Sequence, residues 1–367
     1  MKFKDIARVH IPTFTKVSVC FFAVSVLIKV FAGLFSPFAD FFNRYVASFI
    51  RAAFAYITSV LPFSLAEAVI ITALPLSVIY LLYCAVSASK KGTLPRHMFS
   101  LIGVICLLIG LFTVTFSVAY DCTPMEEKAQ LDTEALSAND IYDACIIMVD
   151  EMDELEQYLV RNEKGSVIMP YSFSEMARVL NRSYSKLCYE YDFISPLYVA
   201  PKRIALSKPL TYTGLAGIYT FFTGEANVNV NFPDYAVTFS SAHEMAHQRG
   251  IAPEDEANFI AFLVCYTSDD PYMKYCALAE GANYLSNTLY EADIELFYKA
   301  AAYFSTETLG EYVAYSNGYA PYADSSAGEI TDIVNDAYLK SQGEKEGVKS
   351  YSLVTTLATA YILKTHK

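Results

Sequence analysis

Two histidines and a glutamate near the middle of the chain have the spacing of a zinc-peptidase motif. His243 and His247 lie four residues apart in the sequence HEMAH, with Glu244 beside the first of them. Side chains four residues apart share one face of a helix, so both imidazoles can bind one metal ion. The glutamate flanks that face and can hold a water whose pKa the metal lowers. The pattern predicts zinc bound by His243 and His247, with Glu244 as the general base of peptide hydrolysis.

Two other interpretations explain the same residues without a metal. Ser241 and Glu244 form an S-x-x-E sequence, which is typical of a capping box at the start of a helix. Two histidines on one helix can also be ordinary surface residues. However, the chain has only five histidines, and two of them flank a glutamate at this spacing. The metal-binding interpretation is therefore favoured.

The first 120 residues have the composition of a membrane region. Hydrophobic residues make up 54% of the sequence and are concentrated in residues 17–34, 66–86 and 101–120. Each run is long enough to cross a bilayer, which needs about 20 apolar residues. Residues 41–62 are also apolar, but they contain Arg44 and Arg51, and their apolar side chains recur at helical spacing. This pattern favours an interfacial amphipathic helix over a fourth span.

The distribution of charge predicts the orientation of the spans. Basic residues precede the first span and fill the loop between the second and third: Lys2, Lys4, Arg8 and Lys16, then Lys90, Lys91 and Arg96. Both segments are therefore predicted to be cytoplasmic, and everything after residue 120 extracytoplasmic. Residues 1–120 hold ten Lys and Arg against three Asp and Glu, a net charge of +7, which leaves −19 for the rest. Such an acidic domain repels phosphates, which argues against nucleic acid as a partner.

A catalytic zinc site needs a third protein ligand and one position open to water. The remaining histidines are poor candidates for this ligand. His10 and His97 are predicted on the other side of the membrane, and His366 is the penultimate residue of the chain. The expected third ligand is therefore a carboxylate.

The carboxylates that follow the motif most closely begin a second predicted helix. Gly250 is well placed to end the motif helix, and Pro253 suits the first turn of the next one. Glu254 and Asn258 are four residues apart, so Glu254 can bind the metal while Asn258 hydrogen-bonds a ligand. Glu256 is the alternative ligand, although it points elsewhere on an ideal helix. Acidic residues in a first helical turn also complement the helix dipole, which needs no metal.

The residues before the motif have the pattern of a small sheet. Residues 227–232 read NVNVNF, and this alternation predicts a half-buried strand. Such a strand is either an exposed edge that can hold an extended peptide or an ordinary strand whose asparagines face water. Residues 236–239 are predicted to form a further short strand, after which Ser240 or Ser241 caps the motif helix. Periodic helical patterns over residues 133–161, 173–189, 277–304 and 354–363 predict a mainly helical α+β domain over residues 121–367.

The residues around the motif resemble a known family. The sequence from His243 to Phe259, HEMAHQRGIAPEDEANF, is similar to the signature of the DUF3810 family of bacterial membrane proteins, which have N-terminal spans followed by an HExxH domain. The likeness extends to LPFS at 61–64, to GIY at 217–219 with GEANVN at 224–229, and to GVKSY at 347–351. It covers most of the chain and implies a metallopeptidase with no assigned substrate.

A more distant resemblance concerns the third ligand. Glu254, Ala257 and Asn258 are similar to the ExxA[DN] helix of gluzincin peptidases, where the glutamate is the third zinc ligand, although gluzincins usually have more than the six residues found here between His247 and Glu254. This likeness implies a zincin-like fold. Enzymes of this type need a donor for the oxyanion besides the metal, and Tyr219, Tyr338 and Tyr351 are candidates.

Together these patterns predict a membrane-anchored zinc metallopeptidase. It would use Zn²⁺, bound by His243, His247 and Glu254, to hydrolyse a peptide or protein substrate. Two other functions fit the same sequence. One is a metal-binding but non-hydrolytic membrane sensor or assembly factor, and the other is a structural membrane protein in which the motif is a capped helix.

Overall fold

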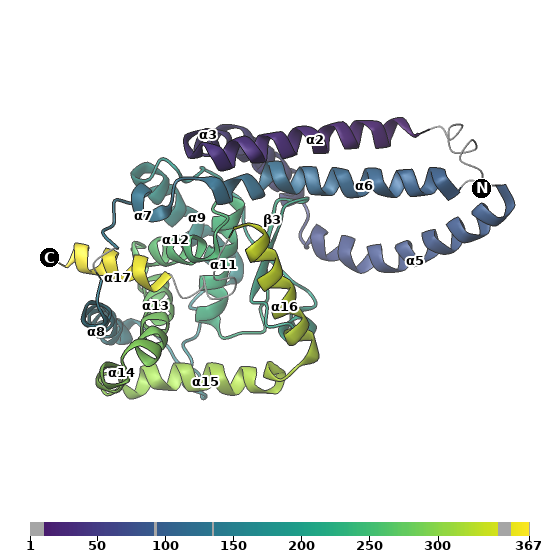
Figure 1. Cartoon of the computed structure of the whole chain (residues 1–367). Coiled ribbons are helices and arrows are strands. Elements are labelled where there is room, and N and C mark those ends of the chain that lie inside the picture. Colours follow the sequence, from purple (N-terminus) through teal and green to yellow (C-terminus); the bar gives the residue numbers. More distant parts are fainter. Residues whose placement is uncertain (1–10, 92–93, 134–135, 344–353, 367) are drawn as a thin grey trace.

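The computed structural model describes residues 11–91, 94–133, 136–343 and 354–366. Three long helices extend to one side of a mainly helical domain that carries a small sheet (Figure 1). The predicted combination of three apolar helices, a mostly helical architecture and a small sheet is confirmed. The basic residues Lys2, Lys4 and Arg8 and the segment 347–351 lie outside the described residues.

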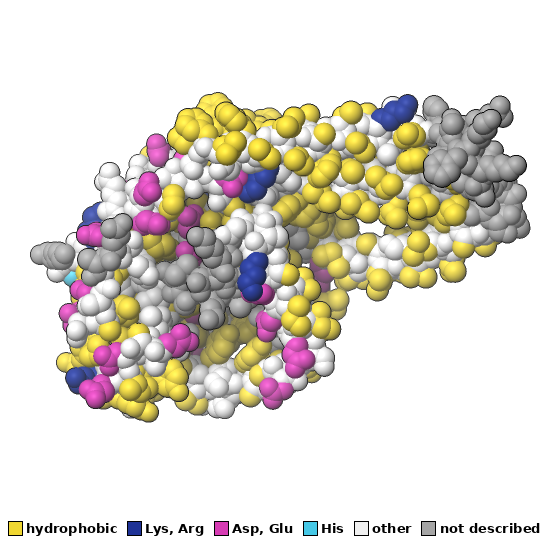
Figure 2. All heavy atoms as spheres, viewed as in Figure 1, with side chains coloured by type: hydrophobic (Ala, Val, Ile, Leu, Met, Phe, Trp, Pro, Cys, Tyr) yellow, Lys and Arg dark blue, Asp and Glu magenta, His cyan; other side chains and the backbone are white. Residues whose placement is uncertain are grey.

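The three long helices match the predicted spans in length and composition. They are α2 (Thr13–Leu34), α5 (Leu65–Lys91) and α6 (Leu94–Thr115). Helix α6 begins and ends earlier than predicted, because the chain tightens after Thr115 into the 3-10 helix η2 (Ser117–Asp121). Helices α2 and α6 pack closely, since a Cβ at Gly110 would lie 2.8 Å from the ring of Phe21. Figure 2 shows hydrophobic side chains along all three helices, and acidic side chains gathered on the domain.

The segment 41–62 is helical, and one of its faces packs on protein. It comprises the end of α3 (Ser36–Phe41), the π-helical turn η1 (Phe42–Ala47) and α4 (Ser48–Ser59). Phe49, Ile57 and Val60 are exposed, in keeping with an amphipathic helix. Arg51, which lies in this predicted interfacial helix, is 1% exposed and faces the domain. The interfacial position of this helix remains a prediction.

The domain core is formed by helices far apart in sequence. The core helices are α8 (Ala138–Leu155), α9 (Phe173–Glu190), α11 (Asp234–Gln248), α12 (Glu254–Tyr266), α13 (Pro271–Ala292) and α17 (Val354–Thr365). The others are α7 (Met125–Lys128), η3 (Glu156–Tyr158), α10 (Ser207–Thr211), α14 (Ile294–Ala301), α15 (Thr306–Ala323) and α16 (Ser326–Ser341). The predicted helix 277–304 is two helices, because the Asp293 side chain accepts hydrogen bonds from Glu295 N and Leu296 N and begins α14.

The sheet has three strands in the order β1-β3-β2, namely β1 (Lys202–Arg203), β2 (Gly217–Thr220) and β3 (Glu225–Val228). The predicted strand over 227–232 is wrong in extent and in exposure. It ends at Val228, lies in the middle of the sheet, and Asn227 and Asn229 are buried. Their amides donate to Ile218 O of β2 and to Leu215 O in the loop before it, so they stabilise these neighbouring segments instead of facing water. The edge strands are β1 and β2.

The motif helix begins earlier than predicted. Residues 236–239 are not a strand, because α11 begins at Asp234 directly after Pro233. Neither Ser240 nor Ser241 is a cap, and Ser241 Oγ donates to Val237 O within the helix. The capping-box interpretation of Ser241 and Glu244 is therefore wrong. The β-branched and aromatic residues of this stretch are buried against the core, and this packing overrides their preference for strands.

Candidate metal centre

The motif helix and the following helix meet through a tight turn. Helix α11 ends at Gln248, and Gly250 adopts a φ of +97°, a left-handed conformation that favours glycine. Pro253 then precedes α12, which begins at Glu254. Both helix boundaries agree with the sequence prediction. The turn sets the first residue of α12 beside the histidine face of α11.

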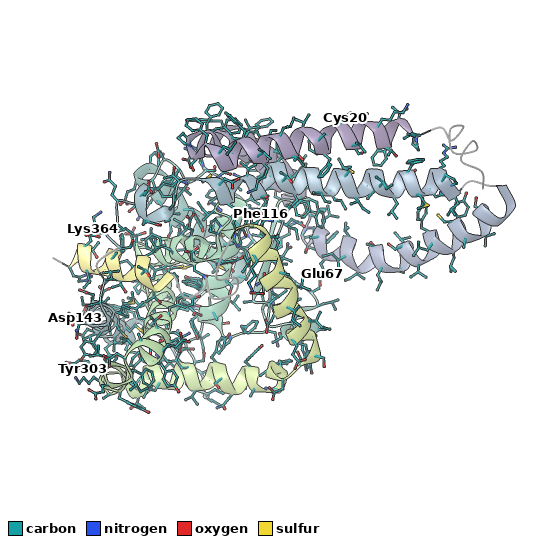
Figure 3. All side chains as sticks on the ribbon, in the orientation of Figure 1. Cys20, Glu67, Phe116, Asp143, Tyr303 and Lys364 are labelled. Carbon is teal, nitrogen blue, oxygen red and sulfur yellow. The ribbon has the colours of Figure 1, made fainter. Side chains whose placement is uncertain are left out.

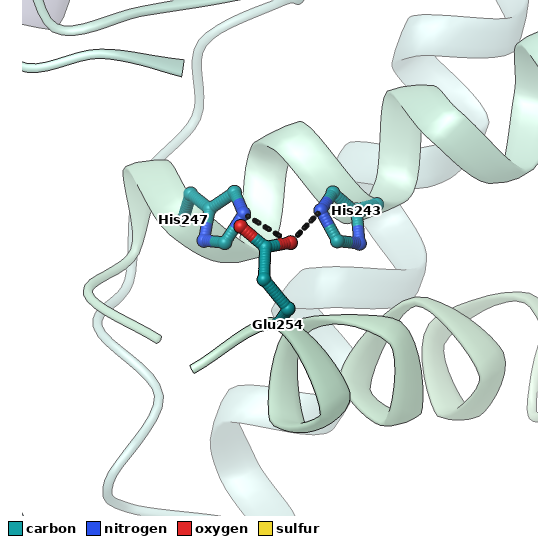
Figure 4. Close-up of side chains that lie close together, drawn as sticks. All are labelled: His243, His247 and Glu254. Atoms are coloured by element: carbon teal, nitrogen blue, oxygen red, sulfur yellow. Dashed lines mark ion pairs between the residues drawn. The ribbon is translucent and has the colours of Figure 1, made fainter. Parts of the chain in front are cut away.

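The two histidines and Glu254 converge on one point (Figure 4). Glu254 Oε2 lies 3.1 Å from His243 Nε2 and 3.5 Å from His247 Nε2. Ligand atoms around a tetrahedral zinc, with bonds of about 2.0–2.2 Å, lie about 3.4 Å apart. The three side chains therefore have donor types found at zinc sites, and the two distances from Glu254 Oε2 to the imidazoles are close to this separation.

Both imidazoles are oriented by hydrogen bonds on their far side. His247 Nδ1 lies 2.7 Å from Ile251 O, which can only accept, so this nitrogen carries the proton. His243 Nδ1 lies 2.8 Å from Asn258 Oδ1, which assigns the proton in the same way. Each Nε2 therefore keeps its lone pair towards Glu254 when the ring is neutral. Asn258 lies where the sequence placed it, as a partner of a candidate ligand.

The charges of the cluster stabilise one another. Burial acts to raise the pKa of Glu254, but the neighbouring His247 and His243 hold it well below its usual range. Burial acts to lower the pKa of His247, but the Glu254 carboxylate outweighs this and raises it to about 9. The result is an ionised carboxylate between two basic rings. This donor set suits a divalent cation, which binds with loss of the ring proton.

Glu244 lies beside the cluster under strand β2. Its carboxylate accepts a hydrogen bond from the backbone of Tyr219, while Oε2 has no partner among the described residues. A Cβ at Gly217 would lie 2.5 Å from Glu244 Oε1, so only glycine leaves room for this side chain. Burial raises the pKa of Glu244 to about 7, although His243 and His247 act to lower it. A carboxyl with a pKa near neutrality is suited to accept and return a proton.

Glu256, the alternative ligand, lies apart from the cluster. Its Oε1 accepts a hydrogen bond of 3.0 Å from Met125 N, and it is not among the residues that converge with the histidines. Burial raises its pKa to about 8, although Lys128 acts to lower it. A carboxyl that is largely protonated at neutral pH is a poor metal ligand. The geometry thus brings Glu254, and not Glu256, to the two histidines.

A cleft of about 590 Å³ opens over these side chains. One wall is β2 with the loop before it, and another includes Phe112 from the last turn of α6 with Phe116 just beyond it. Val334 and Tyr338 of α16 contribute a third. Most of the lining is apolar, and the volume is in the usual range of ligand-binding sites.

The three tyrosines proposed as oxyanion donors differ in position. Tyr219 lines the cleft, and its buried hydroxyl has no hydrogen-bond partner in the described part of the chain. Tyr338 also lines the cleft, and its hydroxyl is 3.1 Å from that of Tyr120. Tyr351 lies outside the described residues. Tyr219 is the better placed of the two that can be compared.

Sequence reasoning missed two features of the site. Glu280, from α13, also lines the cleft, and burial raises its pKa to about 7. A lone glutamate in the apolar stretch ALAEGANYL was the available signal.

Arg51 and Asn43 hold the C-terminal end of α11, since Arg51 Nη2 is 3.5 Å from Arg249 O and Asn43 Nδ2 donates to Gly250 O. The arginine in an apolar run was the signal for this contact.

We expect Asn258→Ala to weaken zinc binding about 10-fold, because His243 would lose the acceptor that orients its ring. Zinc titration of the purified protein measures this loss. Asn258→Asp keeps an acceptor at the same place and should bind zinc nearly as well as the wild type. Unchanged affinity in Asn258→Ala would show that the hydrogen bond has no part in orienting the ligand.

Comparison with known proteins places this geometry in a family context. The family profile described as "Protein of unknown function (DUF3810)" matches residues 42–359, a range that includes the histidine motif, the sheet and α12. Neither a curated protein nor a solved structure matches the chain.

Proposed function

Because the chain belongs to the DUF3810 family, whose description assigns no function, we propose from the site itself that the protein is a membrane-anchored zinc metallopeptidase. The observation that carries the proposal is the convergence of His243 Nε2, His247 Nε2 and Glu254 Oε2 beside the buried Glu244. Two imidazoles and one carboxylate are the ligand set of catalytic zinc sites that leave one position open.

Each residue then has a defined role. His243, His247 and Glu254 would hold the zinc, which supplies a water of lowered pKa and polarises the scissile carbonyl. Glu244 takes a proton from the attacking water as the carbon–oxygen bond forms. It returns that proton to the leaving amine as the carbon–nitrogen bond breaks. Tyr219, whose hydroxyl has no partner among the described residues, is our candidate donor to the oxyanion.

The cleft supports a peptide as the substrate. Strand β2 is an edge strand and lines the cleft, so its outer side can pair with an extended chain. Ile218, in this strand, is 40% exposed. The aromatic and aliphatic lining provides surfaces for apolar substrate side chains. An extended, largely apolar peptide segment fits these features.

Metal analysis and turnover together test the proposal. We expect the purified full-length protein in detergent to hold one zinc per chain, with nitrogen and oxygen but no sulfur ligands by X-ray absorption. It should cleave members of a mixed peptide library, lose this activity with a chelator, and regain it with zinc. Bound zinc without turnover would favour a non-hydrolytic sensor or assembly factor. Absence of zinc binding would favour a structural membrane protein.

We also propose that the domain is extracytoplasmic, on the basis of the basic residues around the spans. A reporter that is active only outside the cytoplasm, fused after Lys367, should be active. The same reporter inserted at Gly92 should be silent. The opposite pattern would place the metal centre in the cytoplasm.

A further inference from the structure

The candidate metal centre lies at the membrane end of the domain. Helix α6, a candidate span, ends at Thr115, and Phe116 follows it. The ring centroid of Phe116 is 5.5 Å from that of His247. Figure 3 labels Phe116 at the point where α6 reaches the domain. The residue directly after the end of a candidate span therefore carries a ring that contacts a candidate metal ligand.

Buried polar contacts fix this arrangement. Arg51 Nη1 donates to Thr115 O at 2.9 Å, at the end of α6. The same guanidinium is 3.5 Å from Arg249 O, just after the motif helix, and Asn43 Nδ2 donates to Gly250 O at 2.9 Å. A Cβ at Gly250 would lie 2.1 Å from Arg51 Nη2, so the fit leaves no free space. The metal centre is thus joined directly to the membrane region and does not stand on a flexible linker.

The sheet is attached to the second span in a similar way. Glu225, in β3, accepts hydrogen bonds from Leu65 N and Ala66 N at the start of α5. Glu67, in the first turn of α5, accepts from Ala205 N and Leu206 N just after β1. Strand β3 therefore begins, and strand β1 ends, beside the start of α5.

Exposed apolar side chains continue from the candidate spans onto the segment that packs against the candidate metal centre. The segment that packs against the end of α11 has exposed large hydrophobic residues, which include Phe41, Tyr45, Phe49, Ile57, Val60 and Phe63. Ion pairs lie at or beyond the ends of the spans. Lys29 Nζ, in the last turns of α2, is 2.7 Å from Asp121, and Lys128 Nζ is 2.9 Å from Asp40. This change from apolar to charged surface is expected at a bilayer interface. This change lies close in the sequence to Asn43 and Arg51, which bind the C-terminal end of α11.

From this arrangement we propose that the substrates are membrane-anchored polypeptides, cleaved in the segment that directly follows their own membrane span. The proposal rests on the proposed peptidase function. The polar layer on each side of a bilayer is about 5–8 Å thick, which about two or three extended residues cross. The cleaved bond is therefore expected within a few residues of the point where the substrate's chain leaves this layer.

Two physical reasons favour an anchored substrate. A chain anchored in the same bilayer is already at the height of the cleft, so its effective concentration there is high. A soluble folded protein would have to place an extended segment at the headgroup layer. Steric contact between its folded body and the domain or the bilayer would oppose this approach. The apolar cleft wall formed by Phe112, Phe116 and Phe221 also suits residues that border a span.

The test uses the full-length protein with zinc in liposomes and three forms of one substrate library. Each form carries the same randomised 12-residue segment. In the first the segment directly follows a single transmembrane helix. In the second a rigid helical spacer of 30 residues separates them by about 45 Å. The third has no membrane helix. Mass spectrometry of the products gives the initial rate for each form, and Glu244→Gln protein serves as the blank.

We expect the first form to be cleaved at least about 10-fold faster than the other two, since only its segment is held at the height of the cleft. Equal rates for all three forms would overturn this substrate class while leaving the peptidase function intact. Faster cleavage of the soluble form would overturn it too. If a zinc-loaded wild-type protein cleaved none of the forms, the peptidase function itself would be wrong, and this inference with it.

Discussion

Glu244→Gln is expected to abolish peptide hydrolysis while leaving zinc bound. Glutamine has nearly the same shape but cannot take a proton from the attacking water, and both imidazoles and Glu254 are retained. The loss of general-base catalysis alone should lower kcat at least about 100-fold. The rate on a cleaved library peptide and the zinc content of the same preparation measure the two effects.

Glu256→Gln is the matched control for this variant. Glu256 is a half-buried glutamate, its pKa is raised to about 8, and its Oε1 accepts a hydrogen bond from Met125 N that a glutamine oxygen can accept equally well. It does not converge with the histidines. Glu256→Gln should therefore keep both activity and zinc. Full activity in Glu244→Gln would show that another group takes the proton.

The second large effect concerns the third ligand. Glu254→Ala removes the carboxylate that lies 3.1 Å from His243 Nε2 and 3.5 Å from His247 Nε2. We expect zinc affinity to fall by at least about 10- to 100-fold, because losing a residue that only hydrogen-bonds a metal ligand already has effects of this size. Competition with a chromogenic chelator measures the change in Kd.

Glu256→Ala supplies the comparison, because it removes a carboxylate two residues further along the same helix. It should destabilise the contact of α12 with Met125 and leave zinc affinity nearly unchanged. Normal affinity in Glu254→Ala with a large loss in Glu256→Ala would transfer the ligand role to Glu256. Normal affinity in both variants would mean that the two histidines have a different third partner.

Much of the candidate site could be predicted from the sequence because it is built from local geometry. His243 and His247 are one helical turn apart, and that spacing holds in any α-helix. Gly250 and Pro253 delimit the turn that follows, so Glu254 is brought back beside the histidines by only a few residues of chain. The same local logic explains the long apolar helices, whose length and composition alone identify them.

Other features depended on partners that are distant in the sequence. The alternation of residues 227–232 suggested asparagines facing water, but strand β2 and the loop before it accept hydrogen bonds from Asn227 and Asn229. The start of α11 was set by burial against the core and not by a serine cap. Arg51 was predicted only to lie in an interfacial helix, whereas the fold surrounds its guanidinium with the carbonyls of Thr115 and Arg249.

The sequence by itself therefore determined the chemical groups of the candidate centre and their order along two short helices, because such spacing is a property of the backbone. Only the tertiary structure decided where that centre lies. The position of His247 beside Phe116, at the end of a candidate span, comes from contacts between residues more than one hundred positions apart. Packing of this kind leaves no periodic signal in a single sequence. Phe116 fits the apolar run of its own segment, and His247 fits the helical spacing of its motif, whether or not they contact one another.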